Sequence, residues 1–154
     1  MAQFARPDAD TVIGEFTDEA AGTTSIFQSI DEVTPEDVGF IQSAAHNAAF
    51  GAAVYACRLS DVTDPVSSSG HILRWRTAVD VAAQEPVDFD LELRQGYVSE
   101  VTQGTLINTA TTTQNRANIT STTFTDTTGT LGGAEADAIT DYTDLFYRMI
   151  LTWT

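Results

Sequence analysis

The residue types most often used for nucleophilic and zinc chemistry are scarce in this chain. One cysteine, Cys57, and two histidines, His46 and His71, are the whole supply. A nucleophilic thiol needs a neighbouring base and a further group that orients that base, and no motif links either histidine to Cys57. Zinc sites draw on several such ligands. We therefore expect no catalytic centre, no metal site and no cofactor, and we interpret Cys57 as a small buried hydrophobe without a disulfide partner.

Three carboxylates have a spacing that could suit general acid–base catalysis. Asp88, Asp90 and Glu92 alternate with apolar residues along one run. Two carboxyl groups flanking a glycosidic bond are the usual machinery of glycoside hydrolysis. Strict alternation with core residues, however, places all three on the wet face of a strand, and nothing in the sequence raises their pKa. We interpret them as a solvated face and expect the protein not to be an enzyme.

Two further groups of acids could offer oxygens to calcium. Asp61 and Asp64 lie beside a serine-rich loop, and Asp137, Asp141 and Asp144 precede the last apolar run. Calcium takes roughly six to eight oxygen ligands, usually from a recognisable loop, and the sequence contains no such loop. We interpret these acids as caps of helices and turns.

Arg74 and Arg76 flank a tryptophan in alternation and are candidate partner-binding residues. Exposed guanidinium groups could bind an acidic patch of a partner through bidentate contacts. The simpler alternative is a solvated strand face on which the arginines pair across the sheet with Asp88, Asp90 or Glu92. Both interpretations stay open at this point, and we favour the second.

The aromatic residues could form a platform for sugar binding. Trp75, Tyr147 and Trp153 have the phase of inward-facing strand positions, so we expect them in the core. Tyr97 and Tyr142 fall in expected turns. These two tyrosines are therefore the better candidates for contact with a partner or a glycan.

The first nine residues precede the first strand signal. Chain ends are often loosely ordered, which is one interpretation of residues 1–9. The other is an N-terminal arm in which Phe4 and Arg6 bind a neighbouring subunit. Phe4 and Arg6 are therefore also candidate partner-binding residues.

Three segments show the period-2 alternation of apolar and polar residues that is typical of a strand with one wet face, and a fourth is a longer apolar run. In the first, Tyr55, Cys57 and Leu59 are expected to face inward, and in the second Leu73 and Trp75. The segments are 55–59, 71–76, 87–94 and 145–153. The last is apolar on both faces except at its arginine, so we expect it to be a central strand.

Weaker strands are expected where threonine, which makes up 24 of the 154 residues, is frequent. A β-branched side chain suits a half-exposed pleated surface. These weaker strands are 11–16, 25–30, 97–106 and 119–124, and short helical turns are expected at 34–37 and 134–139.

Together these signals predict an all-β protein of eight or nine strands. That many strands in one chain of this size close best as an antiparallel two-sheet β-sandwich or jelly roll, here with one or two short helical turns. We expect an N-terminal arm over residues 1–9 and a single β-sandwich domain over residues 10–154.

The charge balance excludes several classes of partner. Twenty-two acidic residues face seven basic ones, all arginine, which gives a net charge of −15 at pH 7. Phosphate backbones and anionic bilayers repel such a chain, so we expect no nucleic acid and no membrane as partners. Apolar runs fall short of the roughly 20 residues of a spanning helix, and residues 1–20 lack the pattern of a secretory signal. We expect a soluble protein.

Five blocks in this order carry a resemblance to a known family: Arg6-Pro7-Asp8-Ala9-Asp10 leading to Gly14, and the segments 29–37, 64–76, 90–96 and 133–145. The arrangement resembles a family of small virion proteins of tailed bacteriophages, common among phages of marine and soil bacteria. The resemblance extends from about Arg6 to Trp153, and the parts around 67–76 and 134–145 are the most specific.

The resemblance implies a β-sandwich on the virion surface and implies no catalytic residues. We expect a non-enzymatic capsid decoration (cement) protein that binds the outer surface of the head and stabilises it. Its partners would be the major capsid protein or other virion proteins, together with sister copies in a homo-oligomer. The alternative is a tail or fibre protein with a receptor-binding or carbohydrate-binding module, for which a glycan is a possible partner.

Overall fold

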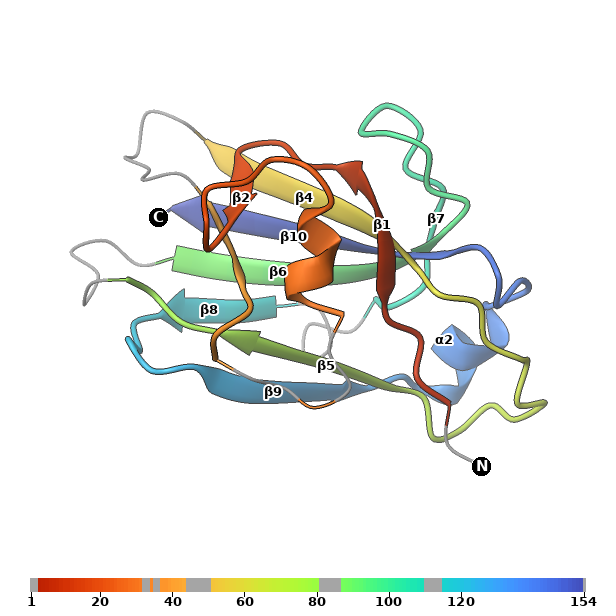
Figure 1. The fold of residues 1–154 in the computed structure, drawn as a ribbon. Coiled ribbons are helices and arrows are strands. Elements are labelled where there is room, and N and C mark those ends of the chain that lie inside the picture. Colours follow the sequence, from red (N-terminus) through yellow and green to blue (C-terminus); the bar gives the residue numbers. More distant parts are fainter. Residues whose placement is uncertain are drawn as a thin grey trace.

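The computed structural model describes residues 3–31, 34, 37–43, 51–80, 87–109 and 115–153, and for 115–118 it describes the backbone only. Within these residues the chain folds into antiparallel strands with one short α-helix and one 3-10 turn (Figure 1). The prediction of an all-β fold is confirmed at this level. No helix in the described ranges is long and apolar enough to cross a membrane.

The elements follow one another along the chain as ten strands and two helical elements within the described residues. They are β1 (Pro7–Val12), β2 (Phe16–Asp18), η1 (Ile26–Ser29), β3 (Ile41–Ser43), β4 (Ala52–Leu59), β5 (Ile72–Thr77), β6 (Val87–Gln95), β7 (Thr105–Leu106), β8 (Asn115–Ile119), β9 (Thr125–Thr130), α2 (Gly133–Asp137) and β10 (Leu145–Trp153).

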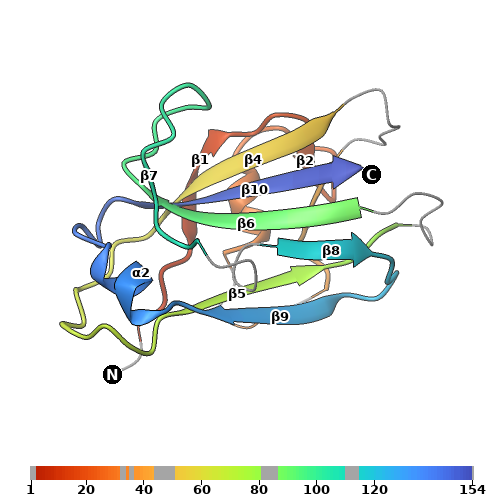
Figure 2. The ribbon, with the colours of Figure 1, turned by 180° about the vertical axis from the view of Figure 1, so that it is seen from behind.

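The largest sheet has six strands in the order β1-β4-β10-β6-β7, and β8 also pairs with β6. β10 lies between β4 and β6 and is antiparallel to both, so the predicted central strand is confirmed (Figures 1 and 2). Two smaller sheets pair β2 with β3 and β5 with β9. Leu145 and the residues in phase with it pack on the main core, and Phe146 on the other face packs on Ala56, so β10 is apolar on both faces.

Alternate residues of the long strands form the core, as the period-2 pattern predicted. Tyr55 and Cys57 are fully buried, and Leu59 is 2% exposed. Leu91 and Leu93 of β6 face the same interior. Burial of these apolar side chains is the main force that holds the sheet in one register, since a slip by one residue would turn them all toward water.

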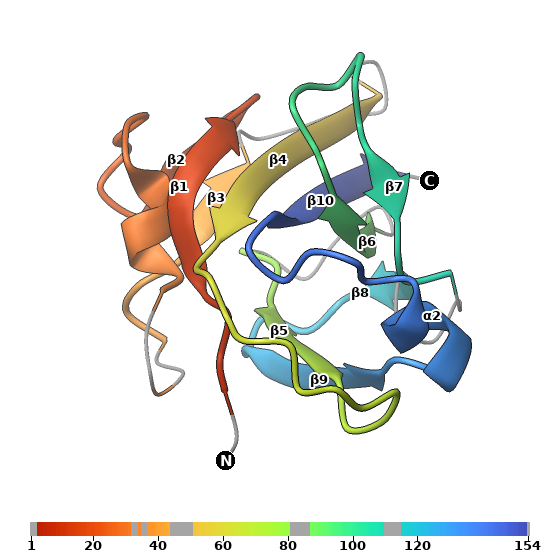
Figure 3. The same cartoon turned by 90° about the vertical axis from the view of Figure 1, so that its right-hand side faces the viewer.

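The β5–β9 pair packs on the other side of this core. Leu73 and Trp75 of β5 are buried and belong to the same apolar cluster as Leu91 and Leu93. Figure 3, viewed along the strands, shows the six-stranded sheet and the β5–β9 pair surrounding one interior. The predicted inward phase of Leu73 and Trp75 is confirmed.

One weak strand prediction is wrong, because segment 25–30 contains the 3-10 turn η1 instead of a strand. The Asp10 carboxylate accepts the N–H groups of Ile26 and Phe27 at 2.8 and 2.9 Å. The hydroxyl of the buried Tyr55 donates to the same carboxylate at 2.7 Å. A carboxylate that binds two successive N–H groups favours a turn over an extended chain.

Three more weak predictions are wrong in their boundaries. Segment 11–16 divides between β1 and β2, with Gly14 at φ +57° between them. Of segment 97–106 only the last two residues are strand, and of segment 119–124 only the first. Threonine content alone does not distinguish a strand from a turn, since Thr and Ser hydroxyls also bond to the backbone in turns.

The N-terminal segment lies against its own chain. Residues 7–9, expected within the arm, belong to β1, which pairs with β4. The Ser60 N–H donates to the Arg6 carbonyl at 2.7 Å, and the Gln3 side chain exchanges two hydrogen bonds with the Thr63 backbone. The first strand therefore begins earlier than predicted.

The helical predictions have different outcomes. The turn expected at 134–139 is confirmed as α2, and the N–H of its N-cap residue Gly132 donates to the Glu135 carboxylate at 2.7 Å. The turn expected at 34–37 lies partly outside the described residues, and so does His46.

Asp10→Ala removes the acceptor of three hydrogen bonds and should lower the free energy of unfolding by about 2–3 kcal/mol. Urea denaturation of the variant measures this loss. Asp61→Ala is the matched control, since its carboxylate forms an exposed ion pair with Arg58 and should cost less than about 1 kcal/mol. Equal losses in the two variants would contradict the role assigned to Asp10.

Candidate functional site

Charged side chains meet on the outer face of the six-stranded sheet, away from the main core. Arg148 of β10 lies opposite Glu92 of β6 in the strand register. Glu92 Oε2 accepts a hydrogen bond from Arg148 Nη1 at 3.0 Å and another from Arg94 Nε at 2.7 Å. The Glu92 side chain is only 15% exposed. The prediction that Glu92 belongs to a solvated face is therefore wrong.

The loop of residues 97–104, which joins β6 to β7, covers this charged face of the sheet. Its Glu100 carboxylate accepts two hydrogen bonds from Arg148, at 2.6 Å from Nη2 and 2.9 Å from Nε. The Tyr97 hydroxyl donates to the same carboxylate, and Arg94 Nη1 donates to the Gln103 carbonyl at 3.1 Å. The loop is thus attached to the sheet through both arginines.

The charges in this cluster balance. Two carboxylates, Glu92 and Glu100, face two guanidinium groups, Arg94 and Arg148. Hydrogen bonds from Arg148 lower the pKa of Glu100, and those to Glu100 and Glu92 raise the pKa of Arg148. Burial raises the pKa of Tyr97. Each shift favours the protonation state already present at neutral pH, so the cluster is suited to fixing a loop.

Tyr97 forms the apolar half of the same attachment. It is 2% exposed and packs on Phe146 and Ala56, with the two ring centroids 5.9 Å apart. The prediction that Tyr97 is an exposed contact residue is wrong. Its position after Gly96 suggested a turn, but the turn carries the ring back over the sheet, where burial of an aromatic ring is favourable.

Asn108 is a structural residue that the sequence did not reveal. It is fully buried after β7, and its side-chain amide accepts from the Leu93 N–H at 2.6 Å and donates to the Leu91 carbonyl at 2.8 Å. The amide thus takes the place of a neighbouring strand beside β6. A lone asparagine between Ile107 and Thr109 carries no sequence signal for this role.

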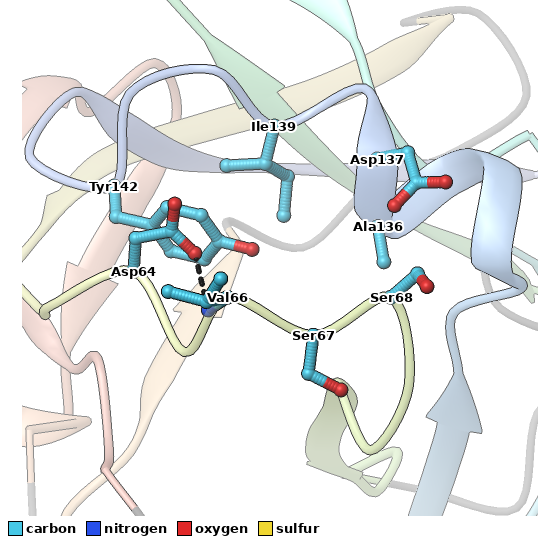
Figure 4. Close-up of a pocket in the computed structure, with 8 residues that line it drawn as sticks. All are labelled: Asp64, Val66, Ser67, Ser68, Ala136, Asp137, Ile139 and Tyr142. Atoms are coloured by element: carbon cyan, nitrogen blue, oxygen red, sulfur yellow. Dashed lines mark hydrogen bonds between the residues drawn. The ribbon is translucent and has the colours of Figure 1, made fainter.

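A pocket of about 290 Å³ lies between the 64–70 loop and the end of α2 (Figure 4). In this view Asp64 and Tyr142 lie at one end, and Asp137 with Ser68 at the other, while Ile139 points between them. The lining residues are Asp64, Val66, Ser67, Ser68, Ala136, Asp137, Ile139 and Tyr142. The pocket is small, acidic at its rim and apolar at Ala136 and Ile139.

Hydrogen bonds fix the polar side chains around this pocket. Asp64 Oδ1 accepts the Val66 N–H at 2.7 Å, and Asp141 Oδ1 accepts from both the N–H and the hydroxyl of Thr143. The prediction that Asp64 and Asp141 act at turns is confirmed. The Tyr142 hydroxyl lies 2.7 Å from His71 Nε2. Tyr142 is half-buried, and burial, followed by the charges of Asp64 and Asp137, raises its pKa.

The two β5 arginines differ in their surroundings. Arg76 forms ion pairs with Asp126 of β9 and with Asp37, each at 2.7 Å. The expected pairing with β6 carboxylates is wrong, because β5 pairs with β9. Arg74 is exposed and has no ion-pair partner among the described side chains. Arg74 is therefore the more exposed of the two arginines.

The remaining candidate residues do not gather at one site. Phe4 is 61% exposed, and the Arg6 guanidinium lies over its ring at 5.9 Å from the centroid. Tyr97 and Tyr142 belong to different apolar clusters. The structure therefore brings together Phe4 with Arg6, but not the two tyrosines that were predicted as contacts.

Cys57 is a free, buried thiol. Burial raises the pKa of the Cys57 thiol to about 12, so the thiol is protonated at neutral pH. Among the described residues no three His, Cys, Asp or Glu side chains are grouped so that they could hold a metal ion. The prediction that Cys57 is a buried small hydrophobe is confirmed.

Comparisons with known proteins give no relative: no family model, no curated protein and no solved structure matches the chain.

Arg148→Met should lower the free energy of unfolding by about 3 kcal/mol, because the Glu100 carboxylate loses its guanidinium partner and Glu92 keeps only Arg94. Urea denaturation checks this value. Arg58→Met is the matched control, since the Arg58 side chain is 38% exposed and its ion pairs should contribute less than about 1 kcal/mol. A loss at Arg148 no larger than that at Arg58 would contradict the structural role of the cluster.

Stability should also depend on the protonation of Glu100. Because its pKa is lowered in the folded state, the stabilisation is complete above the unfolded pKa of about 4.3. It is lost as the pH falls through the lower folded value. Urea midpoints measured from pH 6 to pH 3 should fall less steeply for Glu100→Gln than for the wild type. Glu19→Gln, at an exposed turn, should keep the wild-type slope.

Proposed function

We propose that this chain is a non-enzymatic structural protein of a tailed-phage virion, a decoration (cement) protein that binds the outer surface of the head and stabilises it. The observation that carries the proposal is how the described polar side chains are used. Asp10 binds η1 and the Tyr55 hydroxyl, and Arg148 binds Glu92 and Glu100, so these side chains attach a turn and a loop to the sheet. Such an arrangement suits a protein that acts by presenting a surface.

Within this proposal the fold is a two-sheet β-sandwich of the jelly-roll kind. Support comes from the shared core, to which β5 contributes Leu73 and Trp75 and the large sheet contributes Leu91 and Leu93. A sandwich with two packed layers leaves loops at its ends free for contact. The resemblance of the sequence to small virion proteins points to the same architecture.

The charge of the chain also favours the outside of a head. With a net charge of −15, the chain is repelled by packaged DNA and kept soluble at high copy number. The described acids at strand ends and turns, such as Asp61, Asp64, Asp126 and Asp141, are exposed. Contacts with the capsid and with sister copies would then form at less charged places, including Phe4 with Arg6 and Arg74.

Purified particles of the phage that encodes the chain provide the test. A decoration protein should be present in hundreds of copies per particle, close to the count of the major capsid protein, by quantitative mass spectrometry. Particles made without it should release DNA at a lower temperature than complete particles. Absence from the particles, or depleted particles of unchanged thermal stability, would contradict the proposal.

A second candidate function is a receptor-binding module of a tail or fibre, and the Tyr142 pocket favours it. An aromatic ring beside carboxylates and serine hydroxyls is a common arrangement for holding a sugar. A few to a few dozen copies per particle, with glycan binding that is lost in Asp64→Asn/Asp137→Asn, would favour this function over decoration. A decoration protein should show no signal on a glycan array.

A further inference from the structure

The loop of residues 97–104 presents two valines to water. Val98 is 67% exposed and Val101 is 95% exposed. They lie in one tight turn, in which the Val98 N–H donates to the Thr102 carbonyl and the Thr102 N–H to the Ser99 carbonyl, at 2.9 and 3.0 Å. Single exposed apolar residues are common on protein surfaces, but two on one projecting turn form a local apolar tip.

The loop stands out from the rest of the molecule. It rises beyond the end of β6 in each of the three ribbon views (Figures 1, 2 and 3). A projecting loop can reach into a depression on another surface, where the flat face of a sheet cannot. The position therefore gives the valine tip access to a partner.

The residues between and beside the valines attach the loop to the sheet. Tyr97 is buried against Phe146, and Glu100 makes a bidentate ion pair with Arg148. At the far end Gly104 has φ +64°, and a Cβ there would lie 2.2 Å from the Gln95 carbonyl oxygen. Tyr97 and Glu100 thus point toward the sheet while Val98 and Val101 point away. A loop ordered before binding loses little conformational entropy when it binds.

The tip is electrically neutral in an acidic chain. Glu100 is the one charged residue in segment 96–104, and its carboxylate is paired with Arg148. A partner therefore needs no basic groups at this place, and an apolar depression fits the two valines best. The segment has no basic side chain that would attract a lipid surface, so a protein is the partner that its chemistry favours.

We propose that loop 97–104 is a preorganised docking element whose Val98 and Val101 side chains insert into a shallow, uncharged apolar depression on a protein partner. This inference rests on the proposed function, under which the depression lies on the surface of the virion. The Glu100–Arg148 ion pair positions the tip and does not itself touch the partner.

The test compares binding of purified variants to particles made without the chain, measured by co-sedimentation. Val98→Ser/Val101→Ser should bind at least about tenfold more weakly than the wild type. Its urea midpoint should be unchanged, since both side chains are exposed. Val38→Ser is the matched control, a valine 70% exposed in a different segment, and should bind within about twofold of the wild type.

A second variant separates the positioning role from simple contact. Glu100→Gln keeps both valines but weakens the attachment of the loop, so the amide protons of Val98 and Thr102 should exchange faster with solvent. At neutral pH, where wild-type Glu100 is ionised and paired with Arg148, the variant should also bind more weakly than the wild type. Unchanged amide exchange together with unchanged binding would overturn the positioning role.

The outcomes distinguish the two proposals. If the wild type binds the depleted particles and the double valine variant binds equally well, the docking role of the loop is overturned and the proposed function stands. If the wild type does not bind, the proposed function fails and the inference falls with it. If the double variant instead converts an oligomer of the free chain to monomers with particle binding unchanged, the occupant is a second copy, and the proposed partner is wrong.

Discussion

The outer half of this structure depends on one guanidinium group in a central strand. Arg148 lies on β10 with β4 on one side and β6 on the other, and its side chain is only 11% exposed. A charge in that position is unfavourable unless carboxylates surround it. Glu92 of β6 supplies one carboxylate from the sheet, and the second, Glu100, comes from a loop that must fold over the face to reach it.

Folding that loop back creates a second small core on the outside of the sheet. Tyr97 and Phe146 stack beside the ion pairs, so apolar burial and charge pairing support each other. On the inner side of the sheet a carboxylate likewise holds a turn in place. Asp10 accepts hydrogen bonds from the backbone of η1 and from the hydroxyl of the buried Tyr55. In both places a few polar groups determine the path of a loop, and apolar packing supplies most of the stability.

The arginines of this acidic chain are largely paired with its own carboxylates. Most of the described arginines form ion pairs with carboxylates of the same chain. They are Arg58, Arg76, Arg94 and Arg148. Little positive charge is left on the described surface, at the exposed Arg74 and the half-buried Arg6. Under the docking proposal, recognition relies on shape and apolar surface, and an ordered projecting loop would supply both at low entropic cost.

The sequence by itself determined the long strands. Their apolar residues recur with period 2, because one face of each strand is buried, and this pattern correctly predicted the inward phase of Tyr55, Cys57, Leu59, Leu73 and Trp75. The weak strands failed because a threonine-rich segment without alternation is equally compatible with turns. Tertiary structure alone decided that β5 pairs with β9, that Glu92 and Tyr97 are covered, and that Asn108 replaces a strand. Each of these depends on contacts between distant parts of the chain, about which local periodicity carries no information.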